Sequence, residues 1–220
     1  MLTLNNKVEI CHHAIARISE QKVHGLKSTG MCSILCDIIS DYLKGQDYVS
    51  SLFGYSLHIM YLPEYMPEFY ELAKKADIDT KMAYWFTKDN HDARLAYMRK
   101  LLSIYVAMQK IEIFKRVLEA IEDEKKRDVK SRGLCEYLCI FTPQHMNLTI
   151  YECVNKDITD GSPIILMSML KHYYPELLTE ARAYKDENLD WDQFWFTRFD
   201  HDSRINLINI MLNKYNDAIN

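Results

Sequence analysis

Apolar side chains recur along this chain at every third or fourth position over most of its length. Ile10, Ala14 and Ile18 follow this spacing in one segment, and Leu95 and Leu102 follow it in another. A side chain three or four places further on returns to the same face of an α-helix, so the pattern predicts amphipathic helices. No segment shows the sustained apolar–polar alternation of a half-buried strand. The sequence therefore predicts an all-α fold.

Glycine and proline are scarce, with six and five residues, and they divide the first half into expected helices. Gly45 is expected to end the second helix, and Pro67 suits the first turn of the fourth. The expected helices are residues 8–21, 31–44, 48–61 and 67–76, followed by a last helix that begins after Phe86.

One stretch of ten residues, Trp85–Arg94, occurs again 110 positions later as Trp195–Arg204. Six of its ten positions are identical, and Lys88 is replaced by another cation, Arg198. Earlier segments match at an offset of 103, so that Val8-Glu9-Ile10 corresponds to Ile111-Glu112-Ile113. The repeat predicts a tandem duplication, with about seven residues inserted in the middle of the second copy.

The expected domains are residues 6–107 and 108–217, two homologous helical domains related by a pseudo-two-fold axis. Such symmetry is expected because a duplicated module commonly takes the place of a symmetric dimer. The join at 106–110 has no linker composition, so the last helix of one half is expected to run into the first helix of the next. A short, stiff join predicts a fixed relation between the halves.

Composition places the chain among ordinary globular proteins. It has 220 residues, 48% of them hydrophobic and 26% charged. The net charge of −4 argues against a general nucleic-acid-binding surface, which is normally basic. We expect no signal peptide and no membrane span, since no apolar run approaches about 18 residues. The six cysteines are then expected to be reduced thiols in a cytosol.

The repeated stretch also carries the candidate chemistry. A tryptophan ring offers a stacking platform for a planar base, and a neighbouring cation with an arginine can hold phosphate or carboxylate. This combination predicts a site for a small anionic, nucleotide-like ligand. The predicted ligand-binding residues are Trp85, Lys88, His91, Arg94, Trp195, Arg198, His201 and Arg204.

The same residues have a structural explanation. Asn90 and Asp200 suit the N-cap of a helix, and an aspartate in the first turn suits the helix dipole. The tryptophans are then core anchors. Arg94 and Arg204 are then buried in ion pairs, and their loss costs stability rather than binding. The sequence leaves both interpretations open.

Metal and catalytic sites are not expected. Cys32 and Cys36, and their counterparts Cys135 and Cys139, lie one helical turn apart in apolar segments, which favours buried free thiols over zinc ligands. The His-Asp pairs at 91–92 and 201–202 resemble those of metal phosphohydrolases but lack the further ligands of that class. No Ser-His-Asp set and no glycine-rich phosphate loop is present. We therefore expect no enzyme activity, no cofactor and no metal.

Each half combines a Gly-x-Cys helix, a Trp-Phe pair and an arginine that opens an apolar last helix. In the second half these are Gly133-Leu134-Cys135, Trp195-Phe196 and Arg204. In this respect each half resembles a class of small, mostly uncharacterised bacteriophage proteins. The resemblance implies an accessory protein in the cytoplasm of the host cell. Some small phage proteins inhibit host defence by sequestering nucleotide signals, and the resemblance suggests that role here by analogy.

Three hypotheses of function follow. The first is a non-enzymatic protein that sequesters a small anionic nucleotide-like ligand and so counters host defence. The second is a helical protein-interaction inhibitor of a host defence enzyme, favoured by 15 tyrosines and 11 methionines, residue types suited to interfaces. The third is a metal-dependent hydrolase built on the His-Asp pairs. A homo-oligomer is compatible with all three.

Overall fold

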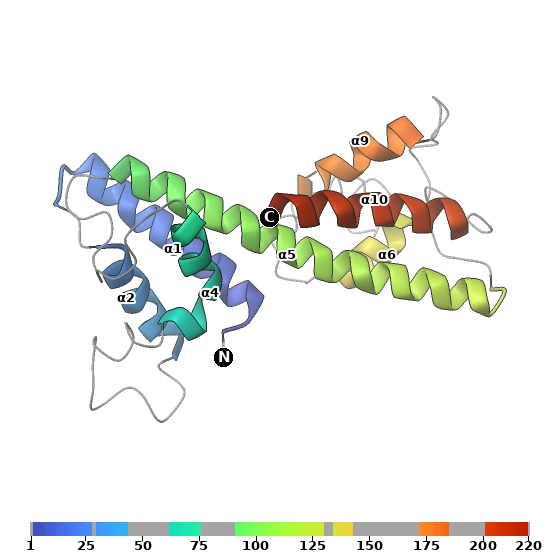
Figure 1. The fold of residues 1–220 in the computed structure, drawn as a ribbon, viewed down its shortest axis with the longest axis horizontal. Coiled ribbons are helices and arrows are strands. Elements are labelled where there is room, and N and C mark those ends of the chain that lie inside the picture. Colours follow the sequence, from blue (N-terminus) through green and yellow to red (C-terminus); the bar gives the residue numbers. More distant parts are fainter. Residues whose placement is uncertain are drawn as a thin grey trace, which may run out of the picture. The chain divides into compact units, whose positions relative to one another are not determined.

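The computed structural model of the chain describes residues 2–27, 30–43, 62–75, 91–129, 134–142, 172–184 and 201–219. Most of these residues are helical and none of them lies in a strand, which confirms the all-α prediction. The helices are α1 (Leu4–Val23), α2 (Met31–Leu43), α4 (Pro67–Lys75), α5 (His91–Lys126), α6 (Leu134–Phe141), α9 (Pro175–Tyr184) and α10 (His201–Ile219) (Figure 1). No helix in these ranges combines the length and the apolar character needed to cross a membrane.

The chain divides into two compact units, Met1–Gln109 and Lys110–Asn220. The division falls inside α5, which is one unbroken helix of 36 residues. The predicted continuity between the last helix of one half and the first helix of the next is thus confirmed. No glycine or proline interrupts this segment, so nothing in its sequence ends the helix earlier.

Helix starts follow local chemistry, with one correction to the predicted ranges. The first helix begins at Leu4 rather than near Val8, because Thr3 caps it. The Thr3 hydroxyl accepts a hydrogen bond from the Asn6 amide at 3.2 Å, and Asn6 Oδ1 accepts one from the Thr3 amide at 3.0 Å. This is a capping box with asparagine in place of glutamate or glutamine. The expected helix over residues 48–61 lies outside the described residues.

In unit 1, α1 runs antiparallel to the N-terminal part of α5 (Figure 1). Polar contacts join the two helices at both ends. Lys22 Nζ lies 2.5 Å from Asp92 Oδ1, and Gln109 Nε2 donates to Asn5 Oδ1 at 2.6 Å. A lysine in the last turn of one helix and an aspartate in the first turn of the other also complement both helix dipoles.

Unit 2 has the corresponding pair of helices, α10 and the C-terminal part of α5. An ion pair joins Lys125 to Asp202 at one end. Near the other end the Lys110 ammonium lies 5.1 Å from the centre of the Tyr215 ring, a cation–π contact. The lysine–aspartate pair therefore occurs in both units at positions that the repeat aligns.

The buried positions of the two units also correspond. Four buried positions of α1 match four buried positions in the unit 2 part of α5, at an offset of 103. These are Ile10, Cys11, Ala14 and Ile18 in unit 1, and Ile113, Phe114, Val117 and Ile121 in unit 2. Phe114 is larger than Cys11, and it packs edge-on against Tyr174 and Tyr215 at ring distances of 5.4 and 5.5 Å.

A lysine, a glutamate and a tyrosine meet in the interior of unit 1. Lys7 Nζ lies 2.9 Å from each carboxylate oxygen of Glu68 and 5.3 Å from the centre of the Tyr105 ring. The Tyr105 hydroxyl donates to Glu68 Oε2 at 3.0 Å. The three residues come from α1, α4 and α5, so one cluster joins three helices. Burial raises the pKa of Tyr105, which keeps its hydroxyl protonated as the donor.

Unit 2 holds the same cluster with one extra ring. Lys110 Nζ lies 3.1 Å from both oxygens of Glu176, and the Tyr215 hydroxyl donates to Glu176 Oε2 at 3.4 Å. The Tyr174 ring adds a second cation–π contact to Lys110 at 5.8 Å. The lysine, glutamate and tyrosine of the two clusters therefore correspond one to one, and the Tyr174 ring is an addition in unit 2.

The first helix of each unit ends in the same kind of left-handed turn. Gly25 has φ +61°, and the Leu26 amide donates to the Gln21 carbonyl at 2.9 Å. In unit 2, Asp128 has φ +53°, and the Val129 amide donates to the Glu124 carbonyl at 3.1 Å. Glycine adopts this conformation without strain, whereas an aspartate does so at some cost.

These two turns predict opposite responses to substitution. Nothing lies within 4 Å of a Cβ placed on Gly25, so Gly25→Ala introduces backbone strain alone. We expect it to lower the free energy of unfolding by about 1 kcal/mol. Asp128→Gly removes strain but adds entropy to the unfolded chain, so we expect no loss or a small gain. Urea unfolding followed by circular dichroism measures both, and a loss of similar size in both variants would contradict the assignment.

Candidate functional site

The repeated stretch ends in a helix start in both units. Helices α5 and α10 begin at His91 and His201, and Asp92 and Asp202 lie in their first turns. The predicted helix start is confirmed at both places. Four of the predicted site residues lie outside the described residues, and their part in a ligand site stays a prediction. They are Trp85, Lys88, Trp195 and Arg198.

Arg94 and Arg204 are both completely buried, with no exposed surface, and each takes part in an interaction within the chain. Burial lowers the pKa of the Arg94 guanidinium from its usual value. An anion arriving from solvent has no accessible guanidinium to meet at either position. This burial is what the structural interpretation expects, and ligand binding by these two arginines stays a prediction.

The two repeated histidines differ in their surroundings. His91 is half-buried, and its Nε2 lies 3.1 Å from the Leu26 carbonyl oxygen. A carbonyl only accepts, so His91 Nε2 carries the proton and donates it. This bond ties the turn at the end of α1 to the start of α5. His201 is buried at the corresponding start of α10.

The cysteines behave as predicted where their side chains are described. Cys32 and Cys36 are buried free thiols, and Cys11, which the sequence analysis did not select, joins them. Burial raises the pKa of Cys32 to about 11 and those of Cys11 and Cys36 to about 12. The side chains of Cys135 and Cys139 lie outside the described residues. Among the described residues, no three His, Cys, Asp or Glu side chains are grouped to hold a metal ion.

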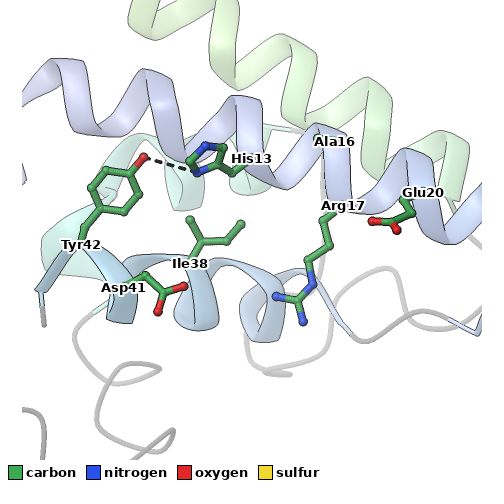
Figure 2. Close-up of a pocket in the computed structure, with 7 residues that line it drawn as sticks. All are labelled: His13, Ala16, Arg17, Glu20, Ile38, Asp41 and Tyr42. Atoms are coloured by element: carbon green, nitrogen blue, oxygen red, sulfur yellow. Dashed lines mark hydrogen bonds between the residues drawn. The ribbon is translucent and has the colours of Figure 1, made fainter.

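A groove of about 610 Å³ opens between α1 and α2 in unit 1 (Figure 2). Sequence analysis did not predict this groove. Its lining comes from two helices, and no sequence motif predicts that these helices pack together. The lining residues are His13, Ala16, Arg17, Glu20, Ile38, Asp41 and Tyr42.

Polar contacts fix the two ends of this groove. The Tyr42 hydroxyl donates to Glu9 Oε2 at 3.1 Å and lies 3.4 Å from His13 Nδ1 (Figure 2). Burial and this hydrogen bond raise the pKa of Tyr42 to about 12, so its hydroxyl stays protonated at neutral pH. Toward the other end, Arg17 Nη2 pairs with Asp37 Oδ2 at 2.9 Å. Polar side chains thus lie at both ends of the groove.

Comparison with known proteins returned no relative. No protein-family model, no curated protein and no solved structure matches this chain.

The burial of the two arginines generates a stability prediction. Arg94→Ala and Arg204→Ala each remove a large, fully buried side chain, so we expect each to lower the free energy of unfolding by about 2–5 kcal/mol. Arg99→Ala is the matched control, because Arg99 is exposed on the same helix as Arg94 and should change stability by less than about 0.5 kcal/mol. Urea unfolding measures all three. Wild-type stability in both buried-site variants would instead favour a ligand-binding role.

The buried thiols generate a pH prediction. Burial raises the thiol pKa from its ordinary value of 9.0 to about 11 for Cys32 and to about 12 for Cys11 and Cys36. Below pH 9 both states keep the protons, so the thiols add no pH dependence. Above pH 9 the unfolded state loses protons first, and the free energy of unfolding falls by up to about 1.4 kcal/mol per pH unit for each thiol.

Cys11→Ala isolates one such thiol. The substitution removes the group that ionises in the unfolded state, so its destabilising effect should be about 1 kcal/mol smaller at pH 10 than at pH 8. Urea unfolding of wild type and variant at both pH values gives this difference. Equal effects at the two pH values would show that Cys11 ionises alike in both states.

Proposed function

We propose that the two units are homologous copies of one helical module and that the chain is a non-enzymatic protein that binds and inhibits another protein. The matched lysine–glutamate–tyrosine clusters and helix-end turns support the duplication. The predicted pseudo-two-fold relation stays a prediction. The resemblance to phage proteins supplies the setting, in which the target is a defence enzyme in the cytoplasm of the host.

The observation that carries this proposal is an exposed aliphatic side chain at the same turn of both units. Leu26 is 54% exposed and Val129 is 42% exposed, and each follows a residue with positive φ. A large aliphatic residue in such a turn usually packs back on its own helix. Here both side chains are exposed to solvent at the same turn of each unit, which leaves them available to an apolar surface of a partner protein.

Hydrogen bonds also restrain both turns, so the chain should lose less conformational entropy when these turns bind a partner. Two backbone hydrogen bonds close each turn: those of Gly25 and Leu26 in unit 1, and those of Asp128 and Val129 in unit 2. In unit 1 the His91 ring adds a third bond, to the Leu26 carbonyl. We call Leu26 and Val129 the apolar tips.

The hypothesis of nucleotide sequestration now has less support than the interaction hypothesis. Its two arginines are buried, and the remaining aromatic and basic residues of that site lie outside the described residues. Nucleotide sequestration stays the alternative hypothesis. The experiment must distinguish it from protein inhibition, because the same variants should affect the two activities differently.

The test uses affinity purification from bacterial host cells with the wild-type chain, the double variant Leu26→Ser/Val129→Ser and the control Ile140→Ser. Ile140 is an exposed aliphatic residue outside the two turns. We expect one host protein to be recovered with wild type and with the control but lost with the double variant. The recovered protein, purified separately, should then lose activity on stoichiometric addition of the wild type or of the control, but not of the double variant.

A thermal-shift screen with mono-, di- and cyclic nucleotides completes the test, since a ligand of the folded state raises its melting temperature. We expect no shift for the wild type. A nucleotide that stabilises the wild type, together with equal recovery of host proteins by the wild type and both variants, would replace the interaction proposal with sequestration.

A further inference from the structure

The turns that carry the two apolar tips have the same backbone hydrogen bonds. In each turn the residue with positive φ donates its amide to the carbonyl three residues earlier, and the tip residue donates to the carbonyl five residues earlier. The second bond runs from Leu26 to Gln21 at 2.9 Å in unit 1, and from Val129 to Glu124 at 3.1 Å in unit 2. These are the bonds of a Schellman turn. The local backbone therefore holds both tips in the same way.

A side chain from another helix distinguishes the unit 1 turn. The Leu26 carbonyl accepts a hydrogen bond from Nε2 of His91, the first residue of α5, at 3.1 Å. The two residues lie 65 positions apart, so this bond holds the turn against a second helix. Its acceptor is the carbonyl of the tip residue itself. The bond therefore restrains the backbone that carries the Leu26 side chain.

The corresponding histidine of unit 2 makes no such bond. His201 is the first residue of α10 and aligns with His91 in the repeat. Its side chain is buried, and its Nε2 has no hydrogen-bond partner among the residues that the structure describes. The Val129 carbonyl thus lacks the histidine donor that the Leu26 carbonyl has.

The residue with positive φ also differs between the two turns. Gly25 has no side chain to restrict its backbone, so the unit 1 turn has more alternative conformations open to it. Asp128 takes the same place in unit 2, where its side chain excludes many of these alternatives. The turn with the freer backbone is therefore the one that receives the additional bond from a histidine.

We propose that His91 is a positioning residue that holds the Leu26 tip in its binding conformation. A tip that is already ordered loses less conformational entropy when it meets a partner. The inference rests on the proposed function for what the tip contacts. The positioning itself is a property of the chain alone, so it can be measured without a partner, and the two proposals can fail separately.

Amide hydrogen exchange of the full chain, followed by NMR, tests the positioning. The Leu26 amide exchanges when the turn opens and its bond to the Gln21 carbonyl breaks. We expect His91→Ala to speed this exchange by about threefold to tenfold, the effect of losing one hydrogen bond. The Val129 amide is the internal control. It should keep its wild-type rate, because its turn opens without breaking the His91 bond.

Two further variants separate a hydrogen bond from a general effect on folding. His91→Gln should restore slow exchange at Leu26, since the Nε2 amide of glutamine can donate to the same carbonyl. His201→Ala is the matched change in unit 2, and it should leave the Val129 exchange rate unchanged. Circular dichroism verifies the helical content of all three variants.

The tautomer of His91 gives an independent readout. A carbonyl only accepts, so the bond requires the proton on Nε2 of the neutral ring. Nitrogen NMR of the imidazole at about pH 8 identifies the protonated nitrogen. We expect Nε2 to carry the proton, and a neutral ring with its proton on Nδ1 would overturn the proposal.

The recovery experiment with host cells tests the link to binding. His91→Ala should lower recovery of the host protein, and His91→Gln should retain it. Wild-type exchange at Leu26 in His91→Ala, no rescue by His91→Gln, or equal acceleration at Leu26 and Val129 would overturn the positioning. Faster exchange with undiminished recovery would overturn its role in binding. Failure of the wild type to recover any host protein would count against the proposed function, while faster exchange in His91→Ala would still support the positioning.

Discussion

The contact on which each unit depends is the lysine–glutamate–tyrosine cluster. Lys7, Glu68 and Tyr105 join α1, α4 and α5 through one set of charged and polar contacts. A largely buried ion pair costs desolvation, which its mutual attraction repays only when further hydrogen bonds satisfy it. The tyrosine hydroxyl and the cation–π contact meet that condition. The cluster therefore sets the register of these helices, and a shift by one turn would leave a charge without its partner.

The spacing of apolar residues and the positions of glycine and proline predict much of the fold. The start of α4 at Pro67 and the unbroken α5 follow from proline placement and from the lack of breakers over 91–126. Ion pairs between residues that lie far apart in the sequence cannot be predicted from these patterns. Lys7 and Glu68 lie 61 positions apart, and a lysine on a helix is normally a solvated residue. Only the packing of the helices reveals that its ammonium lies inside.

The candidate site shows the same limit. Arg94 and Arg204 stand out in the sequence because both copies have them, but repetition alone does not separate a ligand contact from a buried structural residue. Burial separates the two, and it depends on packing that no local pattern encodes.

Under the proposed duplication, a comparison of the two copies separates residues of the fold from residues of function. The Lys–Glu–Tyr cluster and the lysine–aspartate pair occur in both copies, and both lie at helix contacts. The groove border differs: Asp41 has a glutamine at its counterpart. A buried charge has few tolerated alternatives, whereas a border charge at a helix end can change without loss of the fold.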